Sequence, residues 1–124
     1  MKTGKLTLLL LTGSMTASSL FAQENKIIMK NIKQVHDSTT TVSANLIFSG
    51  TENSTRALQI KKDGLLAEHT TKTEAMLICV SGEVIYEDEK KKRFTLKQGD
   101  YLLIVPMVKH WVKGIEDSQL LLIK

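Results

Sequence analysis

The chain of 124 residues contains very little cysteine, proline or aromatic side chain. It has one cysteine and one proline, and Phe, Trp and Tyr together make up 5% of its residues. A single cysteine excludes an intramolecular disulfide, so the fold must be held by its apolar core. Cys79 lies in the apolar run at 75–80 without a neighbouring cation in the sequence, which favours a small buried hydrophobic residue over a reactive thiol.

The chain also lacks a concentrated patch of basic charge. Its 17 lysines and arginines and its 13 acidic residues are spread over termini, loops and hairpins, and they are not interleaved with aromatic residues. This distribution is unlike that of a nucleic-acid-binding surface, so we expect no nucleic-acid partner. The length of the chain is that of one domain, and its apolar fraction of 42% is enough for one compact core.

Long hydrophobic runs are missing except at the N-terminus. Residues 1–5 carry two lysines, residues 6–11 are almost all leucine, and small residues follow as far as Ala22. This order is typical of a secretory signal peptide at 1–22, cleaved near Ala22. The run is shorter than the roughly 20 apolar residues of a membrane-spanning helix, and no cysteine follows it for lipid attachment. We therefore expect an exported protein, periplasmic or secreted, without a stable membrane anchor.

The rest of the chain shows no apolar period of 3.6 residues over a helical length. It consists of short runs rich in valine, isoleucine, leucine and threonine, separated by turns that contain Gly64, Gly82 and Gly99. Strands without crossover helices indicate an all-β sandwich or barrel. The expected strands are 42–48, 57–61, 65–69, 75–80, 84–86, 93–96, 101–105, 108–112 and 120–123.

Two further segments complete this organisation. Residues 23–41 are expected to form an N-terminal strand at 26–29 and a polar connection in which His36 is an exposed loop residue, and residues 42–124 form the barrel. The run 87–93, EDEKKKR, predicts a solvated hairpin tip with charge pairs between its two strands.

A family resemblance rests on glycines and histidines with a particular spacing. Gly64, His69 and Gly82, followed by Gly99 and His110, resemble the two motifs of the cupin superfamily. That family consists of double-stranded β-helix (jelly-roll) barrels. The resemblance implies an all-β cupin barrel, preceded here by the signal peptide, with His69 and His110 facing one pocket.

The sequence departs from the family pattern at several positions. Counting back from Gly82 puts His69 at the first histidine, Thr71 at the second histidine and Ala75 at the glutamate, so two of the four usual metal ligands are absent. In the second motif, Met107 stands at the position of a glycine. Two imidazoles alone hold a metal weakly, since stable sites take three or four protein donors.

A shifted alignment of the first motif is the alternative. If His69 is the second histidine, Glu74 stands at the carboxylate position and only the first histidine is missing, at Ala67. Strand alternation disfavours this alignment unless a bulge lies in between. Under it, a divalent transition metal would be held by His69, His110 and Glu74; otherwise no cofactor is expected.

These observations predict a small-molecule-binding protein with weak or no metal binding. The predicted ligand pocket is the barrel interior, lined by His69, Thr71, Leu77, Cys79 and His110, with further walls at Leu103 and Val112. The alternative is a metal-dependent cupin enzyme of the oxygenase or isomerase class using His69, Glu74 and His110, and a third reading is a subunit-interaction module. Trp111 should point away from His110, to the exterior or to a subunit contact, and we expect a homodimer.

Overall fold

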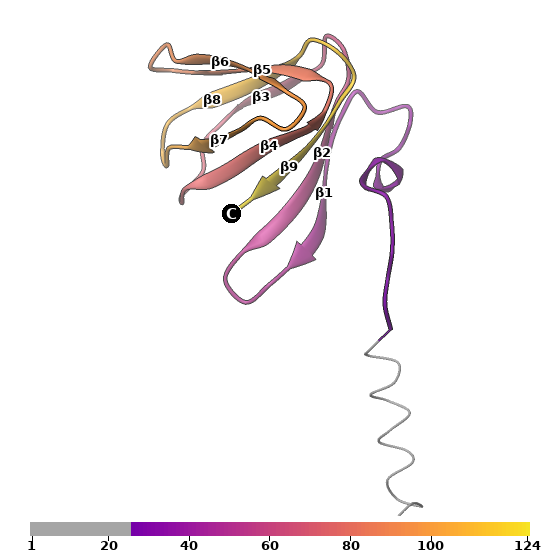
Figure 1. The fold of residues 1–124 in the computed structure, drawn as a ribbon. Helices are drawn as coiled ribbons and strands as arrows, with labels where there is room; N and C mark the ends of the chain where they lie inside the picture. The colour runs from indigo at the N-terminus through magenta and orange to yellow at the C-terminus, as the bar shows by residue number, and fades with distance from the viewer. Residues whose placement is uncertain (1–25) are drawn as a thin grey trace, which may run out of the picture. The chain divides into compact units, whose positions relative to one another are not determined.

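The computed structural model describes residues 26–124, and these residues form an all-β structure, as predicted. A short 3-10 helix precedes the strands (Figure 1). The elements are η2 (Ile32–Val35), β1 (Val42–Ser49), β2 (Ser54–Ile60), β3 (Leu65–His69), β4 (Ala75–Ser81), β5 (Glu83–Asp88), β6 (Arg93–Lys97), β7 (Tyr101–Ile104), β8 (His110–Gly114) and β9 (Ser118–Ile123).

The strands form two antiparallel sheets that enclose a core. One sheet has the strand order β1-β2-β9-β4-β7 and the other β3-β8-β5-β6. Neighbours in these sheets are distant in sequence, for example β4 beside β9 and β3 beside β8, which is the interleaved arrangement expected of a jelly roll. Figure 1 shows the two sheets facing each other.

Alternating burial along the strands defines which side chains face the core. Ala75, Leu77 and Cys79 of β4 are buried, whereas the residues between them are partly exposed. The same period of two appears in β5, where Val84 and Tyr86 are buried. The inner faces of both sheets therefore meet in one apolar core, whose members include residues of β2, β4, β5, β8 and β9.

The outer face of the larger sheet is covered in part by the pre-barrel segment, residues 31–41. The side-chain amide of Gln59 donates to the Thr40 carbonyl at 3.0 Å, and the Lys61 amide donates to the Thr41 carbonyl at 2.9 Å. As a result, β2 is buried on both faces from Ala57 to Ile60.

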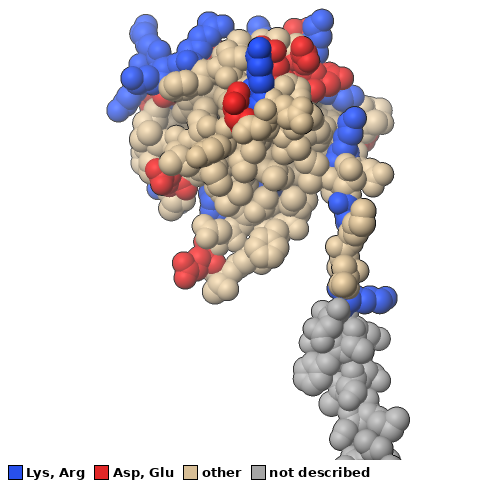
Figure 2. Space-filling model, in the orientation of Figure 1, with Lys and Arg blue, Asp and Glu red and all other residues tan. Residues whose placement is uncertain are grey.

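The charged hairpin between β5 and β6 is confirmed. Glu87 and Arg93 are cross-strand partners, and their side chains form an ion pair at 3.5 Å. Basic side chains project where β6 lies in Figure 1, as Figure 2 shows. Both side chains of the pair are partly exposed, so this ion pair adds little to stability.

Two predictions for the pre-barrel region are wrong. Residues 26–31 form no strand in the described structure, because their backbone groups have no ladder partner, and η2 follows, with the Asn31 side chain accepting from the Lys33 amide at 2.9 Å. His36 is half-buried, and its ring bonds to Ser43 and Asn45, so it is not an exposed loop residue.

Other boundaries shift by only a few residues. The strand predicted at 108–112 begins at His110, because residues 106–107 form a turn in which Met107 has a φ of 64°. The predicted signal peptide at 1–22 lies outside the described residues. Within residues 26–124, no helix has the length and apolar character needed to cross a membrane.

Candidate functional site

His69 and His110 lie side by side on adjacent strands. They are cross-strand partners on β3 and β8, and the register of this pair is irregular between Leu66 and His69. Leu66 packs against the core, so strict alternation would turn the side chain three residues later to the opposite face. The irregularity acts as a bulge that brings the His69 ring onto the same side as His110.

The two rings present the same nitrogen to each other. The Nδ1 of His69 is 2.9 Å from the Ala67 carbonyl oxygen, and the Nδ1 of His110 is 3.1 Å from the Val108 carbonyl oxygen. A carbonyl only accepts hydrogen bonds, so both Nδ1 atoms carry a proton. The two Nε2 atoms then face each other at 3.1 Å.

A positive species between the two Nε2 atoms would stabilise this arrangement. In two neutral rings protonated at Nδ1, both Nε2 atoms would be lone-pair acceptors and would repel each other. One added proton, on either Nε2, converts the contact into an N–H···N hydrogen bond within the normal distance range. A bound cation would have the same effect, so the geometry of the pair suits it to holding a proton or another cation.

The spacing of the pair can be compared with that of two metal ligands. Imidazole nitrogens at about 2.0–2.1 Å from one metal ion lie about 2.8–3.4 Å apart for bond angles of about 90–109°, and the observed 3.1 Å falls in that interval. The donor set, however, ends at two. Within residues 26–124, no group of three or more His, Cys, Asp or Glu side chains is arranged to hold a metal ion. The residues present therefore do not fit the three-ligand metal centre that cupin enzymes imply.

The shifted motif is not assembled in the structure. Glu74 is exposed and lies just before β4, and it joins His69 and His110 in no metal-binding group. Thr71, the residue at the second histidine position, is buried, and its hydroxyl has no hydrogen-bond partner among the described residues. Its backbone carbonyl accepts from the Met107 amide at 2.8 Å, which joins the two motif loops.

The other predicted pocket residues are core residues. Leu77, Cys79 and Val112 are buried and belong to the apolar cluster between the sheets. Burial raises the pKa of the Cys79 thiol, with smaller contributions from Asp100 and Glu83, so the thiol stays protonated and unreactive at neutral pH. The interpretation of Cys79 as a buried hydrophobic residue fits this environment.

A cavity of about 360 Å³ lies next to the histidine pair. It is lined by Tyr86, Asp88, Lys92, Phe94, Leu102, Leu103 and Val105. Its connection to the pair is Tyr86, whose ring stacks on that of His110 with centroids 5.5 Å apart. Apolar walls with a few polar groups are typical of a small-molecule site. Of the predicted residues, only Leu103 lines this cavity.

Sequence analysis missed Tyr86 and Asp88, although strand alternation contains a signal for them. Both are buried on β5, and Tyr86 and Asp88 pair with Val112 and His110 of β8. Inward-facing residues on the strand that pairs with the His110 strand could therefore have been predicted to lie near the site. Burial raises the pKa of the Tyr86 hydroxyl, with a further contribution from Asp88, so that phenol remains neutral.

Burial also controls the protonation of His110. Desolvation lowers its pKa, a shift that outweighs the opposing hydrogen bond to the Val108 carbonyl, while the nearby His69 lowers it further. The His110 ring is only 1% exposed, whereas His69 is half-buried. Burial therefore disfavours the charged form of His110, which is the more deeply buried ring of the pair.

Trp111 lies on the opposite face of β8, as predicted. Its indole nitrogen donates to the Glu87 carboxylate at 3.1 Å, and its side chain is half-buried. This places it on the exterior of the smaller sheet beside the charged hairpin.

Comparison with known proteins gives matches in structure but not in sequence. No family model and no curated protein matches the sequence. A cupin-2 domain protein from Shewanella frigidimarina matches with a TM-score of 0.66 and 17% identity, over 82% of this chain and 96% of that chain. A cupin superfamily protein from Desulfitobacterium hafniense matches with a TM-score of 0.68 and 11% identity, over 81% and 91% of the two chains.

A cupin-like protein from Thermotoga maritima is also similar, with a TM-score of 0.62 and 19% identity over 72% of this chain and 74% of that chain. At these identities the likeness concerns the fold. Together with the two antiparallel sheets and their strand order, it shows that this chain has the cupin fold, a jelly-roll barrel.

Proposed function

We propose that this chain is an exported binding protein that holds a small anionic molecule at the barrel mouth, beside His69 and His110. The observation that carries the proposal is the 3.1 Å approach of the two Nε2 atoms while both Nδ1 atoms are bonded to backbone carbonyls. A proton taken up there makes the pair cationic, and an anion stabilises an imidazolium.

The adjoining cavity supports the same class of ligand. Its volume of about 360 Å³ suits a small organic molecule, and Phe94, Leu102 and Val105 supply apolar surface. Lys92 adds a cation to the lining. The carboxylate of Asp88 is engaged by the backbone amides of Lys90 and Lys92 at 2.8 and 3.1 Å, which limits its repulsion of an anion.

A metal-dependent reaction is not part of this proposal. The histidine pair offers two donors, and Glu74 does not join them. Binding therefore relies on the charge and the hydrogen bonds of the imidazoles and on the apolar walls of the cavity.

The proposal is tested by screening small aliphatic and aromatic carboxylates by ligand-observed NMR against the wild-type protein and three variants. We expect His69→Ala and His110→Ala to weaken binding at least tenfold, and Lys113→Ala, an exposed lysine on β8, to leave it unchanged. His69 is half-buried, so His69→Ala preserves the fold if His110→Ala does not. Equal affinities in the wild type and His69→Ala would refute the proposal.

Export rests on the sequence of residues 1–22. We expect cleavage near Ala22, so that the intact mass of protein from the cell envelope or medium corresponds to a chain that begins close to residue 23. A mass that still includes residues 1–21 would refute export by this signal.

A further inference from the structure

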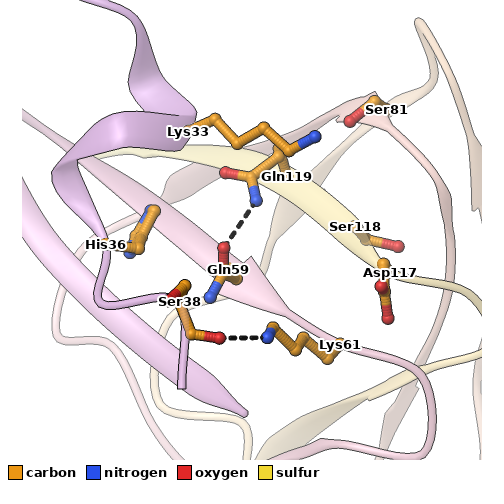
Figure 3. A pocket seen from close by; sticks show the side chains of 9 residues that line it. All are labelled: Lys33, His36, Ser38, Gln59, Lys61, Ser81, Asp117, Ser118 and Gln119. Carbon is orange, nitrogen blue, oxygen red and sulfur yellow. Dashed lines mark hydrogen bonds between the residues drawn. The ribbon is translucent and has the colours of Figure 1, made fainter. Parts of the chain in front are cut away.

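A second cavity lies on the other side of the larger sheet, outside the barrel. Its volume is about 280 Å³, and its lining residues include Lys33, His36, Gln59, Lys61, Asp117 and Gln119. Figure 3 shows these side chains between the pre-barrel segment and strands β2 and β9. Gln59 and Gln119 alternate with the core residues Leu58, Ile60 and Leu120, so they project from the outer face of the sheet.

The orientation of the two glutamine side chains is determined by the backbone. The Gln59 amide nitrogen donates to the Thr40 carbonyl at 3.0 Å, which leaves the Gln59 oxygen as the acceptor of the Gln119 amide nitrogen at 2.9 Å. The Gln119 side-chain oxygen therefore has no hydrogen-bond partner among residues 26–124, although Gln119 is only 7% exposed. In Figure 3 that oxygen points to the side where His36 lies.

The tautomer of His36 follows from the same kind of argument. The Asn45 amide nitrogen donates to the Val35 carbonyl at 3.0 Å and also lies 3.2 Å from the Nδ1 of His36. An NH₂ group only donates, so Nδ1 is the acceptor and the proton of the neutral ring is on Nε2. Desolvation lowers the pKa of His36 and favours this neutral form. The buried Nε2–H has no hydrogen-bond partner in the part of the chain that the structure describes.

The cavity thus contains one unmatched acceptor and one unmatched donor, and its charge is positive. Lys33 and Lys61 line it together with Asp117. Neither lysine is in an ion pair among the described residues, and the Lys61 ammonium donates to the Ser38 carbonyl. The Asp117 carboxylate accepts from the Lys62 amide at 2.9 Å.

We propose that this cavity binds a small carboxylate that also carries a hydroxyl or ammonium group. The carboxylate accepts from the His36 Nε2–H and is attracted by Lys33 and Lys61, while the hydroxyl or ammonium group donates to the Gln119 oxygen. The hydrogen bonds to His36 and to Gln119 each satisfy a buried polar atom that is otherwise unmatched, and such atoms are costly when left without a partner. Water would complete the hydrogen bonds but would not balance the positive charges of the two lysines.

The ligand is small because the cavity is small. At about 280 Å³, it lies at the lower end of the range for small-molecule sites, which suits an acid of a few carbon atoms. The site shares no lining residue with the cavity beside the histidine pair, so it is independent of the function proposed for the barrel mouth.

The test is a titration of ¹⁵N-labelled protein with glycerate and with serine, and with propionate as the control that lacks the second donor. We expect saturable amide shifts near His36, Gln59 and Gln119 with glycerate or serine, and at least tenfold weaker binding of propionate. Gln119→Leu, which removes the acceptor, should abolish this preference.

Variants with little risk to folding complete the test. Lys33 is exposed, and Lys33→Ala should weaken glycerate binding several-fold, whereas Lys113→Ala should not. His69→Ala should leave glycerate binding here unchanged, which separates this proposal from the one for the barrel mouth. Shifts that do not saturate would show that the cavity holds only water, and equal affinities for glycerate and propionate would show that the Gln119 oxygen recognises no second donor; either result would overturn the proposal.

Discussion

Replacing Met107 by glycine should stabilise the protein. Met107 occupies the position where the second cupin motif has glycine, and its φ of 64° lies in the left-handed region. A residue with a Cβ atom in that region costs about 1–2 kcal/mol relative to glycine. The greater freedom of glycine in the unfolded chain offsets about 0.4–1 kcal/mol of this. The Met107 side chain is 66% exposed, so little buried surface is lost.

The net expectation for Met107→Gly is an increase of about 0.5–1 kcal/mol in the free energy of unfolding. For a domain of this size that corresponds to a rise of roughly 2–8 °C in the unfolding midpoint. Thermal and urea unfolding followed by circular dichroism measure both quantities. The Met107 amide, which donates to the Thr71 carbonyl, is kept in the variant.

A matched pair in the β5–β6 hairpin provides the control. Lys91 has a φ of 65°, and its neighbour Lys90 is not among the positive-φ residues. We expect Lys91→Gly to stabilise and Lys90→Gly to destabilise by a few tenths of a kcal/mol or more. If Met107→Gly lowers the midpoint while Lys91→Gly raises it, the methionine makes contacts that this reasoning has neglected, and the backbone explanation for position 107 is refuted.

Three other predictions follow from burial and backbone geometry. Desolvation lowers the pKa values of His36 and His110 in the folded protein. Below about pH 6.5 the unfolded chain therefore binds more protons than the folded protein, and the free energy of unfolding should fall as the pH is lowered through that value. Urea unfolding at several pH values should show a smaller fall in the free energy of unfolding for His36→Gln and for His110→Gln than for the wild type. The same pH dependence in both variants as in the wild type would contradict the lowered pKa values. A Cβ atom at Gly82, whose φ is +90°, would come within 2.4 Å of a backbone carbonyl oxygen, whereas one at Gly99, with a φ of +91°, would meet no atom within 4 Å. Gly82→Ala should therefore lower the free energy of unfolding by about 2–4 kcal/mol and Gly99→Ala by about 1 kcal/mol. Similar losses for the two variants in urea unfolding would argue against the clash at Gly82. We expect a homodimer with Trp111 in its interface. Light scattering at tens of micromolar should therefore show a dimer for the wild type and a smaller species for Trp111→Ala. A wild-type protein that is entirely monomeric would contradict this prediction.

Strand positions were predictable because each strand carries its own local signal. The run from Ala75 to Val80 alternates, after folding, between the core and partly exposed positions, and Gly82 marks the turn that follows it. The pairing of β4 with β9 and β7 is not a local property, and it entered the prediction only through the resemblance to a family. The spacing of motifs around His69 and His110 carried that resemblance.

The details of the sites were less predictable because they depend on contacts between distant segments. The bulge between Leu66 and His69, which turns the His69 ring toward His110, has no marker such as glycine in the sequence. Gln59 and Gln119 look like solvent-facing strand residues when read alone, and they become buried only because the pre-barrel segment covers them. His36 was misjudged for the same reason.

The central claim is that the barrel mouth is a small-molecule site that does not depend on a tightly held metal. Isothermal titration calorimetry with zinc, manganese and iron(II) on the metal-stripped protein tests it most directly. With two imidazoles and, within residues 26–124, no group of three or more His, Cys, Asp or Glu side chains that could hold a metal, we predict dissociation constants no tighter than micromolar, lost in His110→Ala and unaffected in Glu74→Ala. A nanomolar affinity that disappears in both His110→Ala and Glu74→Ala would contradict the claim and establish a three-ligand metal centre.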